Sequence, residues 1–130
     1  MQVRKQLSVF LKNAPGVLAK LSSDLADHEI DILGMTVSDT VDHAVVRLMV
    51  SNPDKAMDIL ESAGQLVVES EVLVLELSNR RGALEDLAER LSRARINIEY
   101  AYGTVGLREK KGVLIIRVSD IKRALKVLRA

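Results

Sequence analysis

The sequence predicts an α+β protein built from two tandem copies of one structural unit. Two observations predict this class. Residues 7–32 match residues 73–98 at a constant offset of 66 positions, and residues 50–60 match residues 118–128 at an offset of 68. In both copies, apolar residues change from a spacing of two, which is typical of strands, to a spacing of three and four, which is typical of helices. A match across several elements at once indicates a duplication.

The first copy, residues 1–70, is predicted to fold as strand, helix, strand, strand, helix, strand. These elements cover residues 6–12, 15–28, 30–38, 44–50, 52–64 and 66–68. Pro15 suits the first turn of the first helix, because its missing N–H has no helical partner there. Asn52 and Pro53 start the second helix, and Gly64 ends it.

The second copy, residues 71–130, repeats this order without the last strand. Its elements are predicted at residues 72–78, 83–94, 96–104, 112–118 and 120–129. The outer edge of strand 72–78 is therefore expected to carry unpaired backbone groups, which another chain or a local loop would cover. Two βαββαβ units indicate ferredoxin-like antiparallel sheets with the helices on one face, the second unit lacking its last strand.

Composition excludes several classes of protein. The chain has 130 residues, of which 48% are hydrophobic and 28% charged, and it has no cysteine, so disulfides and thiolate sites are excluded. No apolar run is long enough to span a membrane, and the N-terminus does not resemble a signal peptide, so we expect a cytoplasmic protein without a membrane partner. Only three aromatic residues are present, which argues against nucleic-acid binding.

The charge is divided unevenly along the chain. Residues 1–65 carry 6 basic and 9 acidic residues, and residues 66–130 carry 13 basic and 9 acidic residues, so the net charges are −3 and +4. Solvated helix faces explain this pattern. Two complementary halves that dock, with the basic half favouring an anionic ligand, are the alternative.

The sequence offers little for catalysis. The two histidines, His28 and His43, both lie in the first copy and neither recurs in the second, and they have no metal-ligand spacing. The acidic residues between 24 and 31 are expected to form a solvated face. Glycine-rich motifs for dinucleotides or nucleoside triphosphates are absent. We therefore expect no catalytic residues, no metal, no cofactor and no enzymatic activity.

The turn from the first strand into the first helix is the most suggestive feature, and it occurs twice. It contains Asn13, Pro15 and Gly16 in the first copy, and Asn79 and Gly82 in the second. A glycine lets a ligand approach the backbone, and the N–H groups at a helix start favour a carboxylate. The asparagine offers both a donor and an acceptor, as a zwitterion requires. Plain turn and capping roles are the alternative.

The motif Asn13-Ala14-Pro15-Gly16-Val17-Leu18, followed by an Ile96-Asn97-Ile98 type of strand start, resembles the ACT domain family. The resemblance covers the whole chain as two units, like the stand-alone tandem ACT proteins of bacteria. It implies a regulatory module that binds a small ligand, most often an amino acid, where two units meet.

The resemblance also implies which residues would bind. One site would combine the loop of the first copy with the strand start of the second: Asn13, Pro15, Gly16 and Leu18 with Asn97. The other would combine Asn79, Gly82 and Leu84 with Asp31. Because Asp31 would repel a ligand carboxylate, the Asn97 site is expected to bind better. Serine-binding members carry a histidine where this chain has Leu11 and Leu77, which favours a more apolar amino acid.

These observations together predict a non-catalytic sensor of an amino acid, in which the two units pair within the chain. We also expect a homodimer and, as the target, a metabolic enzyme or a transporter elsewhere. One alternative is a regulatory subunit that acts on such an enzyme through protein–protein contact. Another is a structural interaction module without a ligand. The sequence does not identify the ligand or the target.

Overall fold

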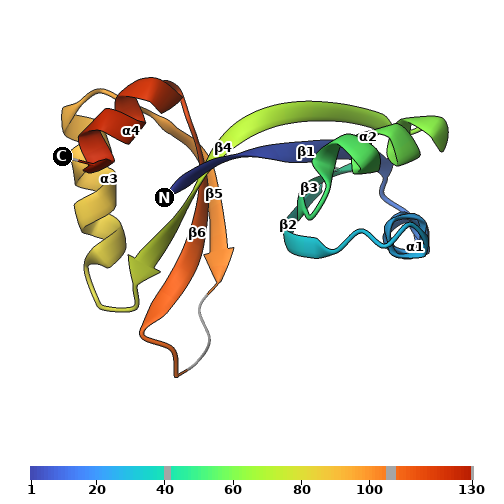
Figure 1. The fold of residues 1–130 in the computed structure, drawn as a ribbon, viewed down its shortest axis with the longest axis horizontal. Helices are drawn as coiled ribbons and strands as arrows, with labels where there is room; N and C mark the ends of the chain where they lie inside the picture. Colours follow the sequence, from blue (N-terminus) through green and yellow to red (C-terminus); the bar gives the residue numbers. More distant parts are fainter. Residues whose placement is uncertain (40–41, 105–107, 130) are drawn as a thin grey trace. The chain divides into compact units, whose positions relative to one another are not determined.

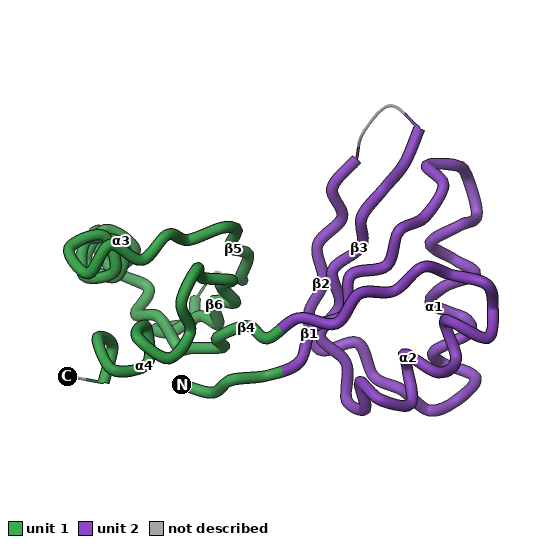
Figure 2. Tube along the Cα trace, turned by 90° about the horizontal axis from the view of Figure 1, so that it is seen from above, with its two compact units in different colours: residues 1–4, 71–130 green, residues 5–70 purple. Residues whose placement is uncertain are grey.

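The computed structural model describes residues 1–39, 42–104 and 108–129 (Figure 1). The chain divides into two compact units, which Figure 2 shows in purple and green. We call residues 5–70 the N-terminal unit, and residues 71–130 together with residues 1–4 the C-terminal unit.

The N-terminal unit has two helices on one side of a four-stranded sheet. Its elements are β1 (Gln2–Lys12), α1 (Val17–Asp27), β2 (Ile32–Asp39), β3 (His43–Val50), α2 (Pro53–Ser62) and the first part of β4 (Leu66–Ser78). The strand order is β2-β3-β1-β4, and β3 is antiparallel to both β1 and β2. Figure 2 shows α1 and α2 together on one side of these strands. Alternating residues of the strands, such as Leu7 and Leu48, pack against Leu25 and Leu60 of the helices and are fully buried.

The C-terminal unit repeats this arrangement. After β4 it contains α3 (Ala83–Arg93), β5 (Ile98–Thr104), β6 (Lys111–Val118) and α4 (Ile121–Arg129), and the strand order is β1-β4-β6-β5. Figure 1 shows α3 and α4 on the same side of β4, β5 and β6. Leu73 and Ile116 of the sheet pack here with Leu91 and Ala124 of the helices. The α+β class and the two ferredoxin-like units predicted from the repeat are confirmed.

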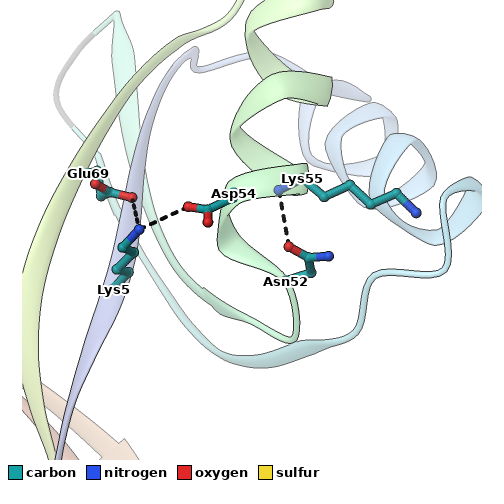
Figure 3. A network of polar contacts seen from close by, with 5 residues as sticks. All are labelled: Lys5, Asn52, Asp54, Lys55 and Glu69. Atoms are coloured by element: carbon teal, nitrogen blue, oxygen red, sulfur yellow. Dashed lines mark hydrogen bonds and ion pairs between the residues drawn. The ribbon is translucent and has the colours of Figure 1, made fainter.

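A charged network joins α2 to strands β1 and β4 of the N-terminal unit (Figure 3). The Nζ atom of Lys5 lies 3.0 Å from Asp54 Oδ1 and 3.5 Å from Glu69 Oε1. The hydrogen bond to Asp54, together with the charges of both carboxylates, raises the pKa of Lys5. Asn52 Oδ1 accepts a hydrogen bond from the backbone N–H of Lys55, 3.2 Å away, and so caps α2 as predicted.

One difference from the sequence prediction concerns β4. The two separate strands expected at 66–68 and 72–78 form one continuous strand of 13 residues. The short stretch between them, which includes the polar residues Glu69 and Ser70, contains neither glycine nor proline. No residue there favours a break in the strand.

The edge of strand 72–78 is also covered differently from the expectation. Among the described residues, no strand follows α4. However, β1 is the hydrogen-bonded neighbour of β4, and residues 1–4 belong to the C-terminal unit (Figure 2). The first residues of β1 thus take the place of the missing strand, and the expected unpaired edge is wrong for this part of β4.

The start of α1 differs slightly from its prediction. The helix begins at Val17, and Pro15 lies in the preceding turn. Gly16 has φ 83°, and Gly82 has φ 89° at the equivalent point before α3. A residue in the left-handed region cannot continue a right-handed helix, so both helices begin one residue after the glycine.

Candidate ligand-binding site

The two asparagine loops are anchored in the same way in both units. The backbone N–H of Asn13 donates to the carbonyl of Asp42, at 3.2 Å, and that of Asn79 donates to the carbonyl of Lys110, at 2.8 Å. Asp42 and Lys110 directly precede β3 and β6, so each asparagine is held at the start of the second strand of its unit's β-hairpin. Asn79 is held further, because its side-chain Nδ2 donates to the carbonyl of Glu109 at 2.9 Å.

The helix starts that follow these loops are not capped by any side chain that the structure describes. Neither α1 nor α3 has a side-chain capping hydrogen bond in the described structure. The carbonyls of Gly16 and Gly82 accept the first helical hydrogen bonds, from Lys20 and Asp86, each at 3.0 Å. The N–H groups of Val17 and Ala83 donate to the carbonyls of Ala14 and Arg80, so the N–H groups that follow them in the first turn remain able to donate to an anionic group.

The apolar residues predicted beside these helix starts are exposed. Leu18 is 41% exposed and Leu84 is 54% exposed, although each lies in the first turn of an amphipathic helix. An exposed leucine next to an uncapped helix start is suited to contact the apolar part of a small ligand or another protein surface. Each loop therefore brings its predicted asparagine, glycine and leucine together in one short segment.

The other two predicted residues occupy equivalent places at the start of β2 and β5. The backbone N–H of Asp31 donates to Ser51 Oγ, and the backbone N–H of Asn97 donates to Ser119 Oγ, both at 2.9 Å. Each serine N–H returns a hydrogen bond of 3.0 Å to the same residue's carbonyl. Both side chains are exposed, and neither has a hydrogen bond within the described residues.

Within one unit, the asparagine loop and the strand start lie at opposite ends of the sheet. Asn13 is beside Asp42, just before β3, whereas Asp31 is beside Ser51, just after β3. The eight residues of β3 separate these ends by about 26 Å, at about 3.3 Å per residue. The same holds for Asn79 and Asn97, which lie at the two ends of β6. No single unit can place both parts of the predicted site on one small ligand.

Two of the predicted residues line cavities in the C-terminal unit. A cavity of about 430 Å³ lies beside Asn79, at the end of β4, β5 and β6. Its lining is Leu77, Ser78, Asn79, Gly103, Thr104, Gly112, Val113 and Leu114. A second, of about 390 Å³, lies beside Asn97 and is lined by Ala88, Ser92, Arg95, Ile96, Asn97 and Ile98. The volumes are typical of small-molecule sites, which span about 300–1,000 Å³.

The two glycines of the first cavity were not among the residues predicted from the sequence. Gly103 and Gly112 lie at strand positions whose counterparts in the first copy are Val37 and Ala44. A comparison of the two copies for positions where a side chain is lost would have identified both.

Among the described residues, none of the helices is long and apolar enough to cross a membrane.

The comparisons with known proteins agree with this architecture. A protein from Bacteroides thetaiotaomicron has 31% sequence identity and a TM-score of 0.92, and the match covers 98% of this chain and 87% of that chain. The regulatory subunit of aspartate kinase from Thermus thermophilus, in a ligand-free form, has 15% identity and a TM-score of 0.73, with 99% and 96% covered.

The regulatory subunit of aspartate kinase from Thermus flavus has 15% identity and a TM-score of 0.65, with 98% of this chain and 92% of that chain covered. A search of the curated proteins found no match. The family model described as an ACT domain pair matches residues 1–129, that is, both units. The chain therefore belongs to the ACT domain pair family.

Proposed function

We propose that this protein is a non-catalytic regulator that binds an amino acid between two ACT units. The observation that carries the proposal is the separation of the two half-sites within each unit. The loop that offers free helix N–H groups and the strand start that offers a free side chain lie about 26 Å apart. A ligand that engages both must therefore bridge two units, of one chain or of two chains.

The two sites we propose are unequal. One joins Asn13, Pro15, Gly16 and Leu18 with Asn97, and the other joins Asn79, Gly82 and Leu84 with Asp31. The helix N–H groups favour the ligand carboxylate, and the asparagine side chains favour its ammonium or carboxylate groups. The carboxylate of Asp31 repels a ligand carboxylate, so the site that contains Asn97 binds an amino acid more tightly.

Ligand binding to two units at once stabilises their paired arrangement, and this provides the regulatory step. A ligand shifts an equilibrium only when it binds one arrangement better than another. The fold shared with regulatory subunits of aspartate kinase supports a metabolic enzyme as the target. We propose that the protein acts on that enzyme as a homodimer, by direct contact. Sedimentation with and without ligand and co-purification with the enzyme test this part of the proposal.

The first experiment is a thermal-shift screen of the purified protein against the twenty amino acids. A ligand at about 100 times its Kd stabilises the folded protein by about 2.7 kcal/mol, which raises Tm by several degrees. Calorimetric titration of each hit then gives its Kd and stoichiometry. A screen without any hit, repeated with the target enzyme present, would contradict the proposal.

Substitutions then assign the site. Asn97→Ala and Asn13→Ala should each weaken binding by about 1.5–3 kcal/mol, the range for hydrogen bonds to a charged group. Asp31→Asn should strengthen the weaker site, because it removes the repulsive charge. Glu61→Gln is the matched control, because it makes the same charge change at an exposed position of α2 away from both loops. Equal strengthening by both substitutions would mean that net charge, and not Asp31, controls affinity.

A further inference from the structure

The cavity beside Asn79 is a feature of the C-terminal unit that the repeat does not explain. Its lining contains no charged side chain: Leu77, Val113 and Leu114 supply apolar surface, and Ser78, Asn79 and Thr104 supply neutral polar groups. Leu77 and Leu114 also pack against the buried core of the unit. By the strand register, Leu77, Leu114, Gly103 and Gly112 share the face of the sheet that carries the helices, whereas Val113 and Thr104 belong to the other face.

Two glycines create the space. In the antiparallel pairing, Leu77 lies opposite Gly112, and Leu114 lies opposite Gly103. Residues directly opposite one another present their side chains on the same face of the sheet. Each cavity-lining leucine therefore has an empty position beside it. At Gly103 the vacancy is obligatory, because a Cβ atom would collide with the carbonyl oxygen of Val113.

The first copy fills the same positions with side chains. Leu11 lies opposite Ala44, and Val46 lies opposite Val37. Ala44 is buried, at 7% exposure, and packs into the sheet where the second copy has Gly112. The duplication has thus produced two loops of similar design, with a hollow built into the sheet beside the Asn79 loop.

The chemistry of the hollow selects its occupant. A charged side chain would lose water there without gaining an ionic partner, which is costly. An aliphatic side chain instead gains by leaving water for the surface of Leu77 and Leu114. The neutral polar residues Ser78, Asn79 and Thr104 lie at the ends of β4 and β5, beside the loop proposed to hold the amino acid's charged groups.

We propose that this hollow binds the side chain of an aliphatic amino acid, of the size of leucine or isoleucine, whose charged groups the Asn79 loop holds. The proposal rests on the proposed function, because it names the side-chain class that one of the two amino-acid sites takes. Charge alone favours the Asn97 site, whereas the hollow makes the Asn79 site the one that discriminates by side chain.

The test fills the hollow from Gly112, because a side chain at Gly103 would disturb the β5–β6 pairing. Gly112→Ala restores the residue type of Ala44, and Gly112→Val adds a residue that strands favour. Val37→Ala is the matched control, because it changes the position equivalent to Gly103 in the other unit. Each variant is titrated calorimetrically with leucine, alanine and lysine, and the leucine and valine methyl groups are followed by NMR.

In the parent protein, leucine should bind at least about ten-fold more tightly than alanine, since a single methylene in an apolar pocket is worth about 10–200-fold. Leucine should shift the methyl signals of Leu77 and Leu114. Gly112→Val should remove most of the preference for leucine while alanine affinity is preserved. Gly112→Ala should show a preference for leucine intermediate between those of the parent and Gly112→Val. Val37→Ala should behave like the parent. Preserved alanine affinity also shows that Gly112→Val is folded.

The remaining outcomes separate the two proposals. If amino acids bind but leucine has no preference over alanine, or lysine binds best, the hollow is not the side-chain site and the proposed function stands. The same conclusion follows if Gly112→Val retains the full preference. If no amino acid binds the parent protein, the proposed function fails, and this inference fails with it.

Discussion

The hydroxyl oxygen of Ser119 accepts a hydrogen bond from the backbone N–H of Asn97 at 2.9 Å, and the Ser119 N–H returns one to the Asn97 carbonyl at 3.0 Å. Ser51 and Asp31 form the same pair of bonds in the other unit. Ser119, which follows β6, therefore fixes the backbone of Asn97, which precedes the neighbouring strand β5. This arrangement leaves the side chains of Asn97 and Asp31 exposed at a defined position.

Substitution of this serine tests whether the pairing positions Asn97. Ser119→Ala removes the acceptor, so we expect the free energy of unfolding to fall by about 1 kcal/mol. Ligand affinity should fall as well, because Asn97 loses its fixed position. Urea denaturation and calorimetric titration measure the two effects. Ser119→Thr keeps the hydroxyl and should remain close to the parent in both. If Ser119→Ala destabilises the protein without changing affinity, Asn97 does not contact the ligand.

The glycines before α1 and α3 give a second prediction. Gly82 has φ 89°, where an L-residue is strained by about 1–2 kcal/mol. We expect Gly82→Ala to lower the free energy of unfolding by about that amount, and Gly16→Ala, at φ 83°, to behave alike. Around Gly16 a Cβ would meet no atom within 4 Å, so backbone strain alone would act there.

The control for this prediction is Gly82→Asn, since asparagine tolerates the left-handed region better than alanine does. It should therefore lose less stability than Gly82→Ala in the same urea titration. Equal losses in the two variants would show that the size of the side chain, and not the backbone conformation, determines the cost.

Much of the fold could be predicted because the duplication makes each local pattern appear twice. The helix spacing that ends in Leu25 recurs in Leu91, and both leucines are fully buried. Two independent copies of one pattern reduce the effect of a misleading residue in either. The strand order follows from the βαββαβ pattern, which is why the prediction of two ferredoxin-like units was correct.

The features that the sequence did not predict depend on contacts between distant segments. Residues 66–78 contain two apolar stretches separated by polar residues, and they form one strand that lies between β1 and β6 in the sheet. Residues 1–4 show no signal that they belong with residues 71–130. The hollow beside Asn79 likewise depends on which residues of β4, β5 and β6 lie opposite one another. Register of this kind is set by tertiary pairing.

A third prediction concerns the cations that contact the ends of α1 and α3. Lys55 Nζ donates to the carbonyl of His28 at 2.9 Å, and Arg123 Nη2 donates to the carbonyl of Ala94 at 2.6 Å. Both residues occupy the same position of the repeat, and a cation at a helix C-terminus stabilises by about 0.3–1 kcal/mol. We expect Arg123→Gln to lower the free energy of unfolding by that amount at low salt.

The matched control for Arg123→Gln is Lys122→Gln. Lys122 is an exposed neighbour on α4, and the substitution removes the same charge away from the end of α3. Thermal unfolding at low and high salt should show a loss for Arg123→Gln that decreases as salt rises. A similar loss for both variants would point to the overall charge of the helix and not to the contact with Ala94.

The last prediction concerns pH and follows from Lys5. Its pKa lies above the ordinary value of 10.5, first because of the hydrogen bond to Asp54 and then because of the charges of Asp54 and Glu69. A group whose pKa is raised on folding binds its proton more tightly in the folded state. The stabilisation by Lys5 is therefore complete below pH 10.5 and is lost as pH rises through the raised pKa.

Lys5→Gln removes this contribution. The difference in unfolding free energy between the parent and Lys5→Gln should be constant from neutral pH to about pH 10, and should decrease at higher pH. Because the carboxylate of Asp54 is 77% exposed, high salt should reduce the difference at every pH. Lys12→Gln removes an equal charge from the end of β1, where the described residues provide no acidic partner, and should show no such decrease. Urea denaturation across this pH range measures the difference in unfolding free energy. If that difference between the parent and Lys5→Gln persists unchanged at the highest pH, packing of the Lys5 side chain, and not its ammonium group, holds α2 against the sheet.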